Sequence, residues 1–385
     1  MTNRTHSVRI AAGGSEPVTV GGIKSFELST DILELADPFS ISMPFHELLW
    51  PAFDTDSEVQ IFIDSTRVLN GFVDRREFVG GKDGVVIDVT GRDKGGRIVD
   101  DAAPFENFVG KGVKELGQIV AGDWFAKVST SNARNRKLIG GKGKTLAGVS
   151  REPAIIGPRD AAKKVEPGET RGQVLGHFLE EAGLLAWSSA DGDEFIIGKP
   201  NYSQVPQFNF FLAAEGSARR NETNVVSIRY AEDVGEVYSE YHVCGSSKGN
   251  GPNYGKNVRR RQASAFDGPG ANGIGNRFYH PKKLVIADDD IRSTKQAKER
   301  ANREAALRQG QGESLEIQVE GWGQPFMGNG EPIIFAFDTL AIVEIEEIGF
   351  DDICLITRVQ FNETKDGGQI ATLSMVTLGT ELVFS

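Results

Sequence analysis

The stretch of sequence that decides the fold spans residues 71–101 and reads GFVDRREFVGGKDGVVIDVTGRDKGGRIVDD. In its second half Val85, Ile87 and Val89 alternate with other residues, so these three side chains share one face of a strand. Between the two halves lies Gly80–Gly84, whose glycines tolerate the positive φ of a tight turn. The stretch therefore predicts a β-hairpin with one face in the core and the other face available for contacts.

Short apolar segments that read as strands occur on both sides of this hairpin as well as within it. Before residue 101 they are Val8–Ile10, Phe26–Leu28, Phe39–Met43, Val59–Ile63, Leu69–Val73 and Val85–Val89. Strands at this spacing predict a small antiparallel barrel. Near the C-terminus the segments are Leu315–Val319, Ile333–Phe337, Leu340–Ile345, Ile353–Phe361 and Ile370–Thr377. They predict a second β-rich domain. Its last turn, Lys365–Gly367, repeats the Lys-Asp-Gly of Lys82–Gly84, which indicates an internal duplication.

The period becomes helical in the middle of the chain. Apolar residues recur at helical spacing within 112–124 and from Thr170 to Gly183. The second of these helices is followed by a predicted hairpin, Leu184–Trp187 with Phe195–Gly198, around a type I′ turn at Asp191-Gly192. The sequence therefore predicts an α+β domain after the first barrel.

Two long segments lack periodicity. Residues 129–164 are basic and rich in glycine, which predicts an exposed or mobile insertion. A strand pair, Val225–Tyr230 with Val237–Val243, precedes a second predicted loop over 246–281. A polar helix is expected from about residue 291 to 309.

Composition narrows the class of protein. The chain has 385 residues and a net charge of −11, which argues against a general nucleic-acid binder. An acidic surface is compatible with a channel through which DNA slides, but charge for solubility is the more ordinary interpretation. No run of about 18 apolar residues and no apolar signal core is present, so we expect neither a membrane span nor export. Two cysteines without a CxxC pair predict neither a disulfide framework nor a zinc module.

Enzyme motifs occur only in broken form. Residues 245–249 match G-x-S-x-G, but the sequence after them is typical of a loop and not of the helix that a nucleophile elbow needs. Residues 140–145 lack the first glycine of a phosphate loop. The histidines stand singly, and Asp288–Asp290 lacks the pattern of a calcium loop, so we interpret it as a helix cap. The sequence predicts no catalytic, cofactor or metal site and no enzyme.

Two further features have an ordinary explanation as well as a functional one. Five acids surround a turn and suggest the acid pair of a glycoside hydrolase, yet nothing in the sequence isolates one desolvated pair. They are Glu344, Glu346, Glu347, Asp351 and Asp352. Trp322 lies between two glycines and is either a binding aromatic or a buried anchor, and we favour the anchor.

The first hairpin resembles that of the baseplate hub proteins of Mu-like contractile phage tails. In that family a Gly-aromatic-Val-Asp strand precedes a strand that ends in Gly-Arg-Asp, followed by a Leu/Ile-Val-Asp segment. Gly71–Asp74, Gly91–Asp93 and Ile98–Asp100 match these positions.

The resemblance extends to the C-terminal part, where the order of elements agrees. A strand at Lys282–Ile286, a helical run at Arg300–Glu304, the Val319–Trp322 signature and a terminal hairpin from Leu355 to Met375 follow one another as in the family. Phe326–Gly330 departs from the Gly-Leu-Trp-type run expected there.

The resemblance implies a mainly β fold with α+β insertions: two tube-like antiparallel β-barrel domains plus helix-hairpin modules. The implied first barrel covers 1–101, and an α+β domain with the basic insertion 129–164 covers 102–200. The second barrel covers 201–245 and 312–385 and is interrupted by a long loop and helix over 246–311.

The resemblance also implies a structural role in a bacteriophage virion. The chain would form a homotrimer on the tail axis and adapt the six-fold tail tube to the three-fold spike. Its partners would be the spike protein, the tail tube or tube-initiator protein and baseplate wedge proteins, with DNA passing through the channel without specific binding. Assembly in the host cytoplasm would place it in the tail baseplate. The alternatives are the hub of a tailocin or phage-derived injection system and a baseplate-associated peptidoglycan hydrolase.

Candidate subunit contacts are arginines. Arg75 and Arg76 lie in the first hairpin, where we expect Arg76 to be exposed, and Arg259, Arg260 and Arg261 form a short basic run in the second loop. In an acidic protein such a run is more typical of a contact with an acidic protein surface than of nucleic-acid binding.

Overall fold

The computed structural model of the chain describes residues 6–47, 49–82, 84–105, 111–131, 165–182, 184–233, 235–245, 262–266, 282–288, 294–325, 332–365 and 367–377. The protein is mainly β, as predicted. It forms two compact units, the first from residues up to Ile228 and from Glu316 to Met375, and the second mainly from Arg229 to Leu315. Among the described residues no helix is long and apolar enough to cross a membrane.

The first half of the large sheet contains the strands that the sequence predicts there and one short strand, over residues 18–19, that the sequence did not predict. They are β1 (Val8–Ala12), β2 (Val18–Thr19), β3 (Ser25–Asp31), β4 (Pro38–Pro44), β5 (Glu58–Ile63), β6 (Thr66–Gly81) and β7 (Gly84–Asp93), in the antiparallel order β3-β4-β7-β6-β5-β1-β2. Ile41, Ile61 and Ile87 are fully buried, so the alternating apolar face is the core face.

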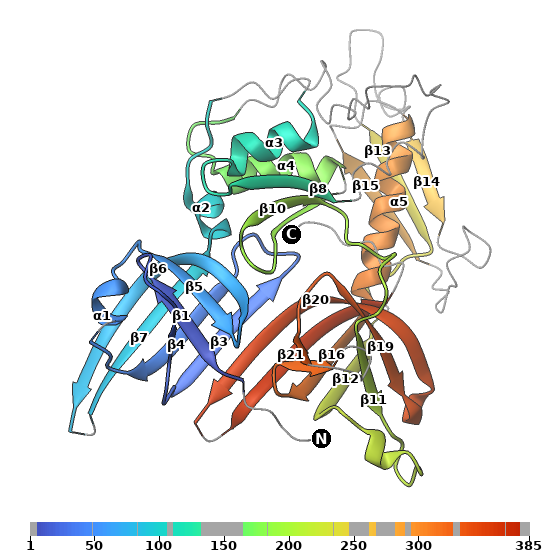
Figure 1. Cartoon of the computed structure of the whole chain (residues 1–385). Coiled ribbons are helices and arrows are strands. Elements are labelled where there is room, and N and C mark those ends of the chain that lie inside the picture. The colour runs from blue at the N-terminus through green and yellow to red at the C-terminus, as the bar shows by residue number, and fades with distance from the viewer. Residues whose placement is uncertain are drawn as a thin grey trace, which may run out of the picture. The chain divides into compact units, whose positions relative to one another are not determined.

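The second half of the sheet comes mainly from the C-terminal part of the chain. It contains β11 (Phe208–Leu212), β12 (Ser227–Glu232), β16 (Glu313–Glu320), β19 (Thr339–Ile345), β20 (Phe350–Thr364) and β21 (Gly368–Thr377). The long strand β20 pairs with β19 over residues 350–356 and with β3 over residues 358–364. One 13-stranded sheet therefore runs through both predicted barrels, with β20 as the strand that joins them (Figure 1).

An α+β layer belongs to the same unit. Helices α2 (Gly95–Asp100), α3 (Val113–Ala121) and α4 (Arg171–Ala182) accompany a small sheet in the order β8-β10-β9, built from β8 (Lys127–Ser131), β9 (Leu185–Ser188) and β10 (Glu194–Gly198). Leu116, Leu175 and Phe195 are fully buried in its core. The two helices and the hairpin confirm the prediction, but the type I′ turn is wrong, because Gly192 has a positive φ of 73° and Asp191 does not.

The second unit is a small sheet with one helix. Strand β13 (Glu240–Gly245) pairs with β14 (Gln262–Phe266) and β15 (Lys283–Asp288), and α5 (Thr294–Gln311) supplies Ala297 and Ala301 to a core with Tyr241 and Val243. The predicted strand pair 225–230 with 237–243 is therefore wrong, because β12 pairs with β16 and β13 with β14 and β15. Strand β14 was missed within the segment 246–281, which was predicted to be a loop.

Candidate interaction surfaces

The Gly-Arg-Asp motif at the end of β7 holds β6, β7 and α2 together. Arg92 Nε donates to Asp74 Oδ2 at 2.7 Å, and Arg92 Nη2 donates to Asp100 Oδ2 at 2.5 Å. The Arg92 guanidinium keeps the pKa of Asp100 below its ordinary value. One side chain thus joins the three segments of the sequence motif, each of which contributes one of these charges.

The two glycines of the motif are required by close backbone approach. A Cβ at Gly91 would lie 2.1 Å from the carbonyl oxygen of Phe72, and a Cβ at Gly71 would lie 2.1 Å from that of Arg92. Both distances are too short for any side chain. The pattern therefore reflects how tightly β6 and β7 pack.

A buried pair of carboxyl groups joins the large sheet to the α+β layer. Asp93 Oδ1 accepts a hydrogen bond from the Asp37 backbone N–H at 3.0 Å, and Asp93 Oδ2 accepts one from the Ser188 hydroxyl on β9. Burial raises the pKa of Asp93 to about 6, and burial together with the Asp93 charge raises the pKa of Asp37 well above its ordinary value. This end of the motif therefore stabilises the fold. Contacts with other molecules are more readily made by other parts of the hairpin.

Arg75 and Arg76 lie in the outer part of this hairpin and have different environments. The Arg75 side chain is 71% exposed and pairs with Glu77 at 2.5 Å. The Arg76 side chain is 26% exposed, because its guanidinium lies 4.5 Å from the ring centroid of Trp50 in α1 (Leu49–Ala52) and 2.9 Å from Asp54. The expectation that Arg76 is exposed was therefore wrong, and Arg75 is the more exposed of the two arginines. The other candidate contacts, Arg259, Arg260 and Arg261, lie outside the described residues.

An aromatic cluster lies beside Arg76 and is partly open to solvent. Phe78 of β6 contacts Phe45 and Trp50 edge to face, with ring centroids 6.0 and 5.9 Å apart. Phe45 is 40% exposed, Phe78 53% and Val85 38%. We call Phe45, Trp50, Phe78 and Val85 the hairpin cluster. Two of its members, Phe78 and Val85, belong to the β6–β7 hairpin, which extends beyond the neighbouring strands (Figure 1). Exposed apolar groups of this kind are typical of contact surfaces.

The face of the large sheet opposite the core is polar. The strand registers place Asn362, Glu27, Ser40, Thr90 and Arg75 directly opposite one another in a row across five strands. A second row contains Thr364, Ser25, Ser42, Asp88 and Glu77. Hydroxyl, amide and charged groups that prefer water therefore cover this face of the first half, from β6 across to the end of β20 that pairs with β3.

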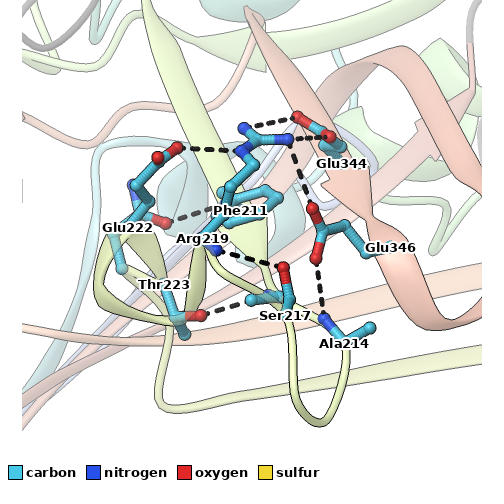
Figure 2. A network of polar contacts seen from close by, with 10 residues as sticks. Phe211, Ala214, Ser217, Arg219, Glu222, Thr223, Glu344 and Glu346 are labelled. Carbon is cyan, nitrogen blue, oxygen red and sulfur yellow. Dashed lines mark hydrogen bonds and ion pairs between the residues drawn. The ribbon is translucent and has the colours of Figure 1, made fainter.

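The acids that suggested a glycosidase are engaged with an arginine. Arg219 lies next to η2 (Arg220–Glu222), and its Nη1 donates to Glu344 Oε1 at 2.6 Å and to Glu346 Oε1 at 3.4 Å (Figure 2). Hydrogen bonds from Ser217 and the Ala214 N–H lower the pKa of Glu346. A glycosidase needs the opposite, an acid whose pKa is raised.

Other candidate chemistry has no support in the described part of the chain. There, no group of three or more His, Cys, Asp or Glu side chains is placed to hold a metal ion. The broken motifs at 140–145 and 246–249 lie outside the described residues. Trp322 is fully buried, with its Nε1 donating to the Asn362 carbonyl at 3.2 Å, which confirms that it is an anchor.

Comparison with solved structures identifies the fold. No protein-family model and no curated sequence matches the chain. The tail protein of Neisseria meningitidis MC58 is 20% identical, with a TM-score of 0.73 over 98% of each chain. The 43 kDa tail protein of prophage MuSo2 from Shewanella oneidensis is also 20% identical, with a TM-score of 0.71 over 98% of this chain and 99% of its own.

The chain is also similar, more distantly, to a component of a secretion system. The c3393 protein of E. coli, a type VI secretion component with structural similarity to the T4 tail proteins gp27 and gp5, is 8% identical. It matches 98% of this chain and 79% of its own, with a TM-score of 0.52. The chain thus shares its fold with phage tail proteins and with a type VI secretion component.

Proposed function

We propose that this chain is a structural protein of a contractile phage tail and, within it, the hub of the baseplate. The observation that supports this proposal best is the likeness over 98% of the chain to two tail proteins, one of them from a prophage. Because the likeness covers the whole chain, it includes both halves of the large sheet together with the insertions between them.

The two halves of the sheet suit a protein that adapts six-fold to three-fold symmetry. Each half contains one long hairpin, of 16 and 10 residues in β6 and β7 and of 15 and 10 residues in β20 and β21. If each half is one tube-like barrel, with boundaries near residues 101, 200 and 312, then three copies offer six similar surfaces to a tail tube. This arithmetic supports the proposal of a homotrimer on the tail axis.

The two surfaces described above have separate roles in this proposal. The polar face lines a water-filled channel through which DNA passes without specific binding, and the hairpin cluster contacts a neighbouring subunit. The remaining partners are the spike protein, the tail tube or tube-initiator protein and the baseplate wedge proteins. The protein assembles in the host cytoplasm and ends in the tail baseplate of the virion.

Solution mass and electron microscopy of the purified chain test the proposal. We expect a mass of three times 41.8 kDa and three-fold rings with a central opening. A chain that stays monomeric alone and also when co-expressed with its spike would contradict the hub.

A second candidate is the hub of a tailocin or another phage-derived injection system, which the likeness to a type VI secretion component favours. A packaged genome distinguishes the two, so genes for a capsid and a terminase beside this gene would favour the phage tail. The hydrolase alternative predicts cleared bands in zymography on peptidoglycan, whereas we expect none.

A further inference from the structure

One edge of the large sheet is closed mainly by side chains, together with one N–H of a loop, and not by a paired strand. Among the described residues, β11 pairs with β19 along one edge. On its other edge the side-chain amide of Gln324 occupies the place of a neighbouring peptide group. The Asn209 N–H donates to Gln324 Oε1 at 3.1 Å, and Gln324 Nε2 donates to the Asn209 carbonyl at 3.1 Å.

Asn224 and Thr223 continue this arrangement along the edge. The Phe211 N–H donates to Asn224 Oδ1 at 2.8 Å, and the Asn224 N–H donates to the Phe211 carbonyl at 3.2 Å. The Ala213 N–H donates to Thr223 Oγ1 at 3.1 Å. Residues 209, 211 and 213 alternate along the strand, so their backbone groups point to the same edge. Their N–H groups, and the carbonyls of Asn209 and Phe211, are all bonded.

The loop that carries Thr223 and Asn224 is fastened at its other end by ion pairs. Arg219 lies 4.0 Å above the Phe211 ring and donates to Glu344 (Figure 2). The Ala214 N–H donates to Glu346 and the Glu215 N–H to Glu347, each at 3.0 Å, and both acids lie in η5 (Glu346–Ile348). These acids therefore hold the loop in position against β11.

The sequence of β11 explains why such a closure is useful. The strand reads FNFFL, and Phe208, Phe210 and Phe211 are buried. An apolar strand with an open edge is a template for pairing with another chain. Two side-chain amides, one hydroxyl group and one loop N–H satisfy its outward backbone groups without offering a further strand, so the sheet stops there.

We propose that Thr223, Asn224 and Gln324 form an edge guard that prevents β11 from pairing with β11 of a second copy of this chain, and that Arg219 holds the guard in place. This inference does not depend on the proposed function, because it concerns association through an edge that the wild type keeps closed. A trimer of wild-type protein is compatible with it, and so is a monomer.

The test removes the guard and measures exchange and mass. In the double variant Asn224→Ala/Gln324→Ala we expect hydrogen exchange at the Asn209 and Phe211 amides to be about ten-fold faster than in the wild type. We also expect a mass by light scattering that exceeds that of the wild type and rises with concentration. Gln360→Ala is the matched control, because this amide bonds to Glu27 on the polar face and touches no strand edge.

A third substitution shows whether association occurs through this edge. Asn209→Pro in the double variant removes the outward N–H of β11, and a proline is tolerated where an edge N–H faces outward. We expect it to restore the wild-type mass. Association that persists in the triple variant, or a folded double variant with wild-type exchange and mass, would overturn the edge guard. If the double variant does not fold, Thr223→Val is the test, because it removes only the hydroxyl that accepts from the Ala213 N–H. Faster hydrogen exchange at the Ala213 amide together with a higher mass in solution would support the edge guard. Wild-type exchange and mass would overturn it.

Discussion

Asp93 is the residue at which the sequence motif and the fold are most directly connected. It is 4% exposed, yet it is a carboxyl group that bonds to backbone on one side and to Ser188 on the other. A buried carboxyl group is stable only if it is well bonded or protonated. The raised pKa of Asp93, about 6 against an ordinary value of 3.8, therefore links the stability of the protein to pH.

The direction of this pH dependence follows from the shift. Between pH 4 and 6 folded Asp93 holds its proton and unfolded Asp93 does not, so the free energy of unfolding falls as pH rises through this window. Asp37 acts in the same direction. Asn at position 93 cannot ionise. As pH rises from 4.5 to 7, we therefore expect the free energy of unfolding of Asp93→Asn to increase by on the order of 1–2 kcal/mol relative to that of the wild type, measured by urea denaturation. Asp338, whose pKa burial also raises to about 6, should keep its own slope in this variant. Equal slopes for wild type and variant would contradict the prediction.

At the scale of elements, the β6–β7 hairpin has a buried end that stabilises the fold and an exposed end that is free for contacts. The hairpin cluster lies at the exposed end. We expect Phe78→Ser to change the free energy of unfolding by less than about 1 kcal/mol, because half of the side chain is already in water. If the cluster contacts a neighbouring subunit, the same variant should lower the fraction of trimer at a given concentration, measured by light scattering.

The matched control for this prediction is Val285→Ser in β15. Val285 is 66% exposed and lies in the second unit, away from the hairpin in sequence. We expect it to leave the trimer fraction unchanged. Equal effects of Phe78→Ser and Val285→Ser would show that the hairpin cluster is not the contact.

Which elements the sequence predicts depends on whether their signal is local. Strands such as β4 and β7 alternate clearly because one face is buried, and they were predicted. The partner of β12 was not predicted, because β12 pairs with β16, which lies far along the chain. Strand β11 was also missed, since FNFFL hardly alternates and is defined by its pairing with β19. The same limit applies to Arg76, because the spacing of residues in the sequence does not indicate that its guanidinium packs on Trp50.

At the scale of the whole molecule, β20 is the strand that connects the two halves of the large sheet. Its residues 350–356 belong to the second half and its residues 358–364 pair with β3 of the first. Near the join, Phe361 is 1% exposed and contacts Trp322 with ring centroids 6.1 Å apart. Trp322 in turn contacts Phe26 of β3, at 5.3 Å. A defect at Phe361 should therefore reach both halves.

We expect Phe361→Ala to lower the free energy of unfolding by about 3–5 kcal/mol, because it leaves a cavity among buried aromatic rings. Hydrogen exchange should become faster in β3 and β4 of the first half and in β19 and β21 of the second half. Phe195→Ala is the control with the same change in volume in another core, that of the α+β layer, and should speed exchange first in α3, α4 and β10. If Phe361→Ala affected β19 and β21 and left β3 and β4 as in the wild type, the halves would be independent barrels joined by a strand that transmits no stability. The symmetry argument for the hub would survive that result, since it needs two similar halves in each chain and not one cooperative sheet.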